Sequence, residues 1–119
     1  MYSIRVEGSF SSAHNLRGYK GSCEDLHGHN WRVEVVVNSG DLDKLGMVMD
    51  FRVVKVRLNS ILDKMDHAYL NNIAYFKKVN PTSENIAKYI FDHMKAKISK
   101  LESVTVWESD NSCATYYAD

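Results

Sequence analysis

The residues best suited to chemistry in this sequence are three histidines. His27 and His29 are separated only by Gly28, in a stretch whose apolar and polar residues alternate as in a β-strand. Their side chains therefore point to one face, roughly 6.5–7 Å apart along the strand, where both imidazoles can reach one ion. His14 ends an earlier alternating stretch and shares the parity of its apolar face. Three neutral imidazoles with an open fourth position are typical of catalytic zinc, so we expect His14, His27 and His29 to bind Zn²⁺.

Other interpretations of this spacing stay open. A His-x-His pair in a strand is most often two partly exposed polar residues, and three histidines also accept other divalent ions. The metal site is favoured because His27 and His29 share the parity of the valines that follow, and a buried histidine needs a partner. His93, which lies among lysines in a helical stretch, is expected to be solvated.

Three further residues near these histidines could move protons. Cys23 lies four residues before His27 in a polar loop, where a nearby cation would lower the pKa of its thiol. The alternative is a small buried hydrophobe, which we expect for Cys113. Asp66 and His67 are adjacent at a helix end, where the carboxylate could orient and stabilise the imidazole. The alternative for this pair is a solvated helix end.

Glu108 is a carboxylate on the apolar side of a predicted strand. It shares the parity of Val104 and Val106. An inward carboxylate costs free energy unless it is paired or binds a ligand. The pattern therefore indicates a ligand anchor, with a salt bridge to a lysine as the alternative.

The hydrophobic pattern predicts the elements that position these side chains. Alternation indicates strands over 2–14, 27–38, 104–108 and 113–117, and a helical period covers 51–65. A second helix opens at Pro81, is capped by Thr82 or Ser83, and has an apolar face that reaches Ile98. Residues 15–26 and 66–80 are expected to be loops. The order β-β-α-α-β-β predicts an α+β fold, with an antiparallel four-stranded sheet and both helices on one face.

Composition limits the class of protein. The 119 residues fit a single domain over 1–119, and fifteen basic residues balance fifteen acidic ones, so nothing favours nucleic-acid binding. No apolar run reaches membrane-span length, and charges interrupt the N-terminus where a signal peptide would be apolar, so we expect a cytoplasmic protein. Two cysteines make no disulfide framework. The valine-rich second strand, with Val36 on its other face, suggests that another subunit covers the sheet.

Six blocks in this order carry a family resemblance. They span nearly the whole chain, and they are Phe10-Ser11-Ser12-Ala13-His14; Cys23-x-x-x-His27-Gly28-His29-Asn30; Gly46-Met47-Val48-Met49-Asp50-Phe51; Asp66-His67-x-x-Leu70-Asn71; Pro81-Thr82-Ser83-Glu84-Asn85; and Trp107-Glu108-Ser109. Together they resemble the 6-pyruvoyl-tetrahydropterin synthase superfamily. They are most similar to its branch of 6-carboxy-tetrahydropterin synthases in queuosine biosynthesis.

The resemblance implies a fold, a site and a reaction. The fold would be the tunnelling fold, whose subunits complete a barrel by oligomerisation, typically as a dimer of trimers with active sites between subunits. Zinc would be bound by the three histidines. The catalytic residues would be Cys23, Asp66 and His67, and Glu108 would hold the pterin ring with Thr82 and Ser83. The implied substrate is 7,8-dihydroneopterin triphosphate, and the implied products are 6-carboxy-tetrahydropterin, acetaldehyde and triphosphate.

Alternatives within and beyond this family remain. Glu24 directly follows Cys23, and some relatives that resemble a folate-type aldolase carry a glutamate at this spacing in place of the cysteine. A 6-pyruvoyl-tetrahydropterin synthase would use the same residues as the 6-carboxy branch. A zinc-stabilised pterin-binding module without turnover would not need Cys23 or the Asp66–His67 pair. Contacts to the triphosphate stay unassigned: Arg17, Lys20 and Arg52 are candidates, with a solvated surface position as the alternative for each.

Overall fold

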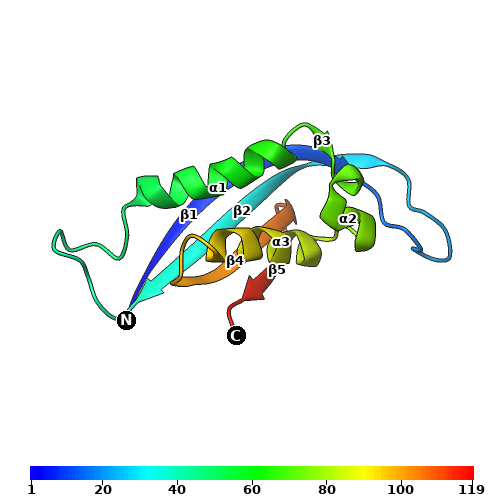
Figure 1. Ribbon diagram of the computed structural model, residues 1–119. Coiled ribbons are helices and arrows are strands. Elements are labelled where there is room, and N and C mark those ends of the chain that lie inside the picture. Colours follow the sequence, from blue (N-terminus) through cyan, green and yellow to red (C-terminus); the bar gives the residue numbers. More distant parts are fainter.

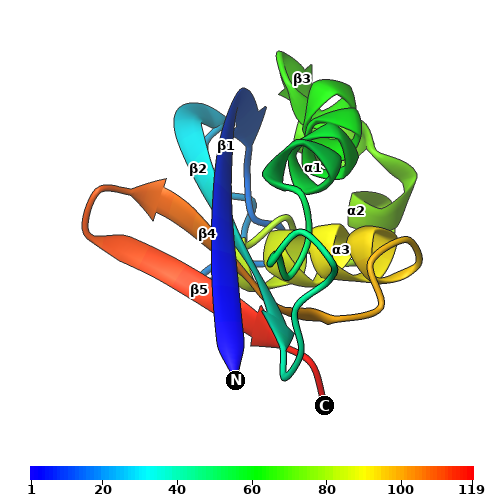
Figure 2. The ribbon, with the colours of Figure 1, turned by 90° about the vertical axis from the view of Figure 1, so that its left-hand side faces the viewer.

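The chain folds as a curved sheet with its helices on one face (Figures 1 and 2). The computed structural model describes residues 1–119. In chain order its elements are β1 (Tyr2–His14), β2 (His27–Ser39), α1 (Phe51–Met65), β3 (Ala68–Tyr69), the 3₁₀ turn η1 (Leu70–Asn72), α2 (Ala74–Lys78), α3 (Ser83–Lys95), β4 (Leu101–Ser109) and β5 (Ser112–Tyr117). The predicted α+β class, with both long helices on the same side of the sheet, is confirmed.

The sheet differs from the prediction in one respect. Its strand order is β3-β1-β2-β4-β5, and the four long strands pair antiparallel as expected. The fifth strand, β3, runs parallel to β1 through the pairs Ser12–Ala68 and Ala13–Tyr69. The expectation of a purely antiparallel four-stranded sheet was therefore wrong. A two-residue strand leaves no alternation in the sequence to detect, and the five-residue α2 is equally too short to show a helical period.

Alternation along the two long strands builds the core. Trp31, Val33 and Val35 of β2 are fully buried beneath the helices. The helices contribute the side chains of their apolar faces, namely Val54, Leu58, Leu62 and Met65 of α1 and Ile86, Ala87, Ile90, Phe91 and Met94 of α3. Gly8 of β1 lets α1 lie close to the sheet, because a Cβ there would be 2.8 Å from Leu62 Cδ1. This packing places α1 against β1, while α3 lies against β4 and β5.

Side-chain caps set where the helices begin. The Asp50 carboxylate accepts a hydrogen bond from the Arg52 backbone N–H at 2.9 Å, as the sequence indicated for α1. Of the two predicted caps for α3, the structure selects Thr82, whose hydroxyl accepts from the Asn85 N–H at 3.1 Å. None of these helices has the length and hydrophobicity required to cross a bilayer.

Candidate functional site

The β1–β2 register brings the three histidines together. His14 pairs directly with His27 across the two strands, and His29 lies opposite Ser12, two residues further along. All three rings lie on the helix-covered face, with centroids 4.6–5.1 Å apart. The Nε2 atoms of His14 and His27 are 3.0 Å apart. Trp31 packs edge-on against His14 and His29 and forms an apolar floor below them.

Backbone carbonyls orient two of these rings. His14 Nδ1 donates a hydrogen bond to the Pro81 carbonyl at 2.8 Å, and His27 Nδ1 donates to the Asp25 carbonyl at 2.9 Å. A carbonyl only accepts, so each Nδ1 carries the proton and each Nε2 presents a lone pair toward the cluster. Such outer partners are typical of metal-binding histidines, whose tautomer and orientation they hold. The sequence analysis did not identify either carbonyl, because backbone groups carry no residue-type signal.

Glu108 joins this cluster from β4. Its Oε1 lies 2.9 Å from His29 Nε2 and 3.5 Å from His14 Nε2. One ligand atom from each of His14, His27, His29 and Glu108 lies within 4.8 Å of the others. Four ligands about 2.0–2.1 Å from a zinc ion would be separated by about 3.4 Å, so these spacings suit a tetrahedral divalent ion. The sequence predicted Glu108 as a pterin anchor, whereas the structure places its carboxylate among the histidines.

His29 shows that the cluster suits a metal ion. Its Nε2 is buried and has no hydrogen-bond partner of good geometry, although Glu108 Oε1 is near. Burial lowers the pKa of His29, with opposition from the Glu108 carboxylate and reinforcement from the neighbouring histidines. The neutral ring is therefore favoured at pH 7, which is the form that binds a metal. A buried nitrogen left without a hydrogen bond is explained if an ion is its partner.

Asp66 and His67 form a pair at the start of β3. Asp66 Oδ2 lies 3.0 Å from His67 Nδ1, while Asp66 Oδ1 accepts from the Ser11 backbone N–H at 2.8 Å. The His67 N–H donates in turn to the Ser11 carbonyl at 2.6 Å. His67 has a positive φ of 53° and a largely exposed side chain. The short β3 strand thus holds the Asp66 carboxylate against β1 and leaves the His67 imidazole exposed.

The Asp66 contacts predict a pH dependence of stability. The Ser11 N–H, and then His67, hold the pKa of Asp66 below its usual 3.8. Because folding favours the charged form, this contribution is present above the unfolded-state pKa and is lost as pH falls through the folded-state value. We expect Asp66→Asn to remove this part of the acid sensitivity, measured as urea unfolding midpoints between about pH 6 and about pH 3. Asp63→Asn, which removes an exposed α1 carboxylate without such contacts, should keep the wild-type slope.

Cys23 lies in the loop between β1 and β2 and is exposed. No hydrogen bond or ion pair joins it, or the Asp66–His67 pair, to the histidine cluster within one chain. Its neighbour Glu24 has a structural task, since its Oε1 accepts from the Leu16 N–H at 3.2 Å and lies 3.8 Å from His27 Nδ1. The Glu24 carboxylate, which the aldolase alternative would use, therefore stabilises the loop and lies on the Nδ1 side of the His27 ring.

Two asparagines fasten this loop to the helical side. Asn71 accepts from the Asn15 N–H at 3.1 Å and donates to the Asn15 carbonyl at 2.8 Å. Asn80 makes the same double contact with the backbone of Arg17, at 2.9 Å for each hydrogen bond. Each amide imitates a peptide group and pairs with the loop as a neighbouring strand would. Asn71 ends one of the six recognised blocks and Asn80 directly precedes another, but the sequence analysis assigned a role to neither.

Arg17 clamps the loop and is not free for a phosphate. Its Nη2 donates to the carbonyls of Phe76 at 2.6 Å and Val79 at 2.9 Å. The other two cations considered for the triphosphate lie on the surface: Arg52 pairs with its own helix cap Asp50, and Lys20 lies over the Tyr19 ring. The structure therefore supports the surface or structural alternative for each of them.

Thr82 and Ser83 lie at the start of α3, directly after the Pro81 carbonyl that holds His14. We expect Thr82→Ala to lower the free energy of unfolding by about 1 kcal/mol, because it removes the cap of the Asn85 N–H. Thr82→Ser keeps a hydroxyl there and serves as the control. Chemical denaturation of both variants tests this, and equal losses would assign the effect to the Thr82 methyl group.

Comparison with known proteins assigns the family. Residues 3–119 match the family model described as 6-pyruvoyl tetrahydropterin synthase. The chain belongs to this family of pterin enzymes. It is 40% identical to the 6-carboxy-5,6,7,8-tetrahydropterin synthase of Synechocystis sp., over 99% of this chain and 95% of that protein. It is 36% identical to the dihydroneopterin monophosphate aldolase of Pyrococcus furiosus, over 90% of each chain.

A solved structure shows the same fold. The 6-pyruvoyl tetrahydropterin synthase of Caenorhabditis elegans superposes with a TM-score of 0.88 at 31% identity, covering 99% of this chain and 96% of that one. The agreement over almost the full length of both chains shows that the sheet and its helical cover are those of the family. The predicted family is therefore confirmed.

Proposed function

We propose that this chain is a zinc-dependent lyase that converts 7,8-dihydroneopterin triphosphate and water to 6-carboxy-5,6,7,8-tetrahydropterin, acetaldehyde and triphosphate, as a step of queuosine biosynthesis. The observation that carries the proposal is the cluster of His14, His27 and His29, two of them oriented by backbone carbonyls. The 40% identity to a 6-carboxy-5,6,7,8-tetrahydropterin synthase supports this product over others in the family.

The three histidines would hold the zinc ion, with Glu108 beside it. When bound, zinc would make the side-chain hydroxyls of the substrate and the adjacent C–H more acidic. Glu108 is positioned to contact substrate groups close to the metal, because its carboxylate lies 2.9 Å from His29. Such contacts near the metal would add to the pterin-anchoring role expected for Glu108 from the sequence. The start of α3, with Thr82 and Ser83, would offer hydroxyl and backbone contacts to the pterin.

Cys23, Asp66 and His67 would handle the protons. The Cys23 thiol is exposed and can exchange protons at the junction of pterin ring and side chain. Asp66 would orient the His67 ring through the 3.0 Å contact with Nδ1, which leaves Nε2 to exchange a proton with the substrate. Triphosphate leaves by elimination, and a carbon–carbon bond of the side chain then breaks to release acetaldehyde.

Oligomerisation would complete this site. Within one chain, no hydrogen bond or ion pair joins Cys23 or the Asp66–His67 pair to the histidine cluster, and the sheet face away from the helices is uncovered (Figure 2). We infer that neighbouring subunits cover this face and supply the missing groups, in a dimer of trimers in the cytoplasm. Analytical ultracentrifugation tests the assembly: a hexamer supports the inference, whereas a monomer that turns over substrate contradicts it.

Product analysis tests the reaction. Zinc-loaded protein would be incubated with 7,8-dihydroneopterin triphosphate and the products identified by mass spectrometry. We expect 6-carboxy-tetrahydropterin together with acetaldehyde. A 6-pyruvoyl product would assign the biopterin-type synthase, and unchanged substrate on metal-loaded protein would favour a pterin-binding module.

A folate-type aldolase is the second candidate. It is favoured by Glu24, whose carboxylate lies 3.8 Å from His27 Nδ1, and by the likeness to an archaeal aldolase. Its product would be 6-hydroxymethyl-dihydropterin. Turnover that survives Cys23→Ala but fails in Glu24→Gln would establish this alternative, and the reverse pattern would support the synthase.

A further inference from the structure

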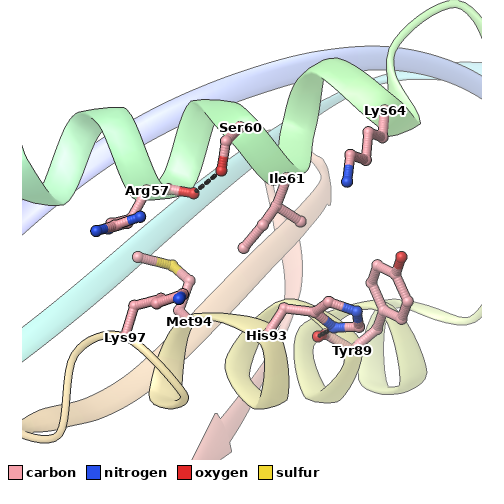
Figure 3. Close-up of a pocket in the computed structure, with 8 residues that line it drawn as sticks. All are labelled: Arg57, Ser60, Ile61, Lys64, Tyr89, His93, Met94 and Lys97. Atoms are coloured by element: carbon pink, nitrogen blue, oxygen red, sulfur yellow. Dashed lines mark hydrogen bonds between the residues drawn. The ribbon is translucent and has the colours of Figure 1, made fainter.

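A basic cavity lies between α1 and α3, apart from the histidine cluster (Figure 3). It encloses about 210 Å³. Four of its eight lining side chains are basic or histidine and none is acidic; the lining consists of Arg57, Ser60, Ile61, Lys64, Tyr89, His93, Met94 and Lys97. No residue of this cavity belongs to the proposed catalytic or metal-binding set.

Helical spacing places the charges on facing surfaces. Arg57 and Lys64 are seven residues apart on α1, and so share one face about 10 Å apart along the helix axis. His93 of α3 and Lys97 just after it lie four residues apart and face α1 across the gap, as Figure 3 shows. The apolar side of the cavity is formed by Ile61 from one helix and Met94 from the other.

These cations have no acidic partners. No carboxylate lies within 4.0 Å of the charged groups of Arg57, Lys64 or Lys97, although the chain has as many acidic as basic residues. A neighbouring lysine on α3, Lys88, does pair with Asp92 at 2.7 Å. Three cations without an acidic partner therefore line one cavity, and a bound anion would supply their counter-charge.

Fixed polar groups complete the cavity. The Nδ1 atom of His93 donates to the Tyr89 carbonyl at 2.8 Å, and the two rings lie 4.2 Å apart, which holds the imidazole in place. The Tyr89 hydroxyl keeps its proton, because burial raises its pKa, and it can donate to an anion. Ser60 donates to the Arg57 carbonyl at 2.9 Å and leaves its oxygen as an acceptor.

We propose that this cavity binds a small anion with several phosphate groups, either a free oligophosphate or the triphosphate of a nucleotide. Cations spread along about 10 Å of α1 suit a chain of phosphates better than a single one. The enclosure between two helices favours a small molecule over a nucleic acid, whose binding would require an open basic stripe.

Calorimetric titration of sodium triphosphate into metal-stripped protein tests this site. We expect measurable binding that weakens at least tenfold in the double variant Arg57→Gln/Lys97→Gln and at least threefold in Lys64→Gln. Lys55→Gln, which changes a lysine of α1 outside the cavity, should bind like the wild type. Circular dichroism would confirm that each variant keeps its helices.

Two further titrations, with inorganic phosphate and with ATP, identify the ligand. Inorganic phosphate should bind at least tenfold more weakly than triphosphate, and ATP that binds more tightly than triphosphate would identify a nucleotide as the occupant. The proposal is overturned if the double variant binds triphosphate as well as Lys55→Gln does, or if phosphate and triphosphate bind equally. Triphosphate bound only at the catalytic site would be unaffected by the double variant. Unchanged triphosphate affinity in that variant would therefore count against binding in this cavity.

Discussion

Replacing His29 with alanine is expected to lower the affinity for zinc by more than about 100-fold and to abolish turnover. Loss of an outer partner of a metal ligand already costs about 10–100-fold, and here a direct ligand is removed. His29 supplies the buried Nε2 that has no good hydrogen bond, so its loss removes one of three convergent donors. Metal content after dialysis, measured by inductively coupled plasma mass spectrometry, and competition with a chromophoric chelator quantify the effect.

His93→Ala is the matched control, since this histidine lies on α3 outside the cluster. It should keep full zinc content and turnover. Full metal occupancy in His29→Ala would contradict the assignment. Glu108→Gln is informative beside it: a fall in zinc affinity would identify the carboxylate as a fourth ligand, whereas unchanged affinity with lost turnover would assign it to the substrate.

Replacing Cys23 with alanine is expected to reduce turnover about 10²–10⁴-fold, while zinc content and pterin binding persist. This is the range that a positioned proton-transfer group contributes. Cys23 makes no side-chain hydrogen bond and is exposed, so its removal should leave the fold intact. Steady-state rates, metal analysis and pterin fluorescence titration on the same preparation separate lost chemistry from lost binding.

Cys113→Ala is the control for thiol removal in general. The sequence analysis expected Cys113 to be buried, but it is exposed at the start of β5, where it pairs with Trp107 of β4. The two variants therefore each remove one exposed thiol. Equal rates for both would contradict a proton-transfer role for Cys23, and a loss confined to Cys23→Ala would support it.

Local sequence patterns were sufficient to predict most of the architecture. Period-two alternation located the long strands, and the period of 3.6 located α1 and the apolar face of α3, because both patterns record which side chains are buried. Asp50 could be predicted as the N-cap of α1 from the sequence, because a cap depends on the residue type at one position. The spacing of His27 and His29 indicated a shared face for the same reason.

Short and non-local features could not be predicted in this way. β3 and α2 span too few residues to show a period. β3 exists because the backbone of His67 and Ala68 pairs with Ser11 and Ser12 of β1, 56 residues earlier in each case. The end of α3 was also placed too late: the helix ends at Lys95, while Ile98 stays buried in the turn that follows. The apolar side chain of Ile98 therefore indicates that the residue is buried, but not that it is helical.

The sequence by itself determined which residues are candidates for the chemistry, while the tertiary structure decided what each of them contacts. Glu108 was predicted to point inward, but only the pairing of β4 with β2 brings it to His29. Arg17, considered from the sequence as a phosphate contact, has a structural role, because its guanidinium binds two backbone carbonyls. Burial follows from residue type and period along the chain, whereas contacts depend on strand register and helix packing, which are set by groups far apart in sequence.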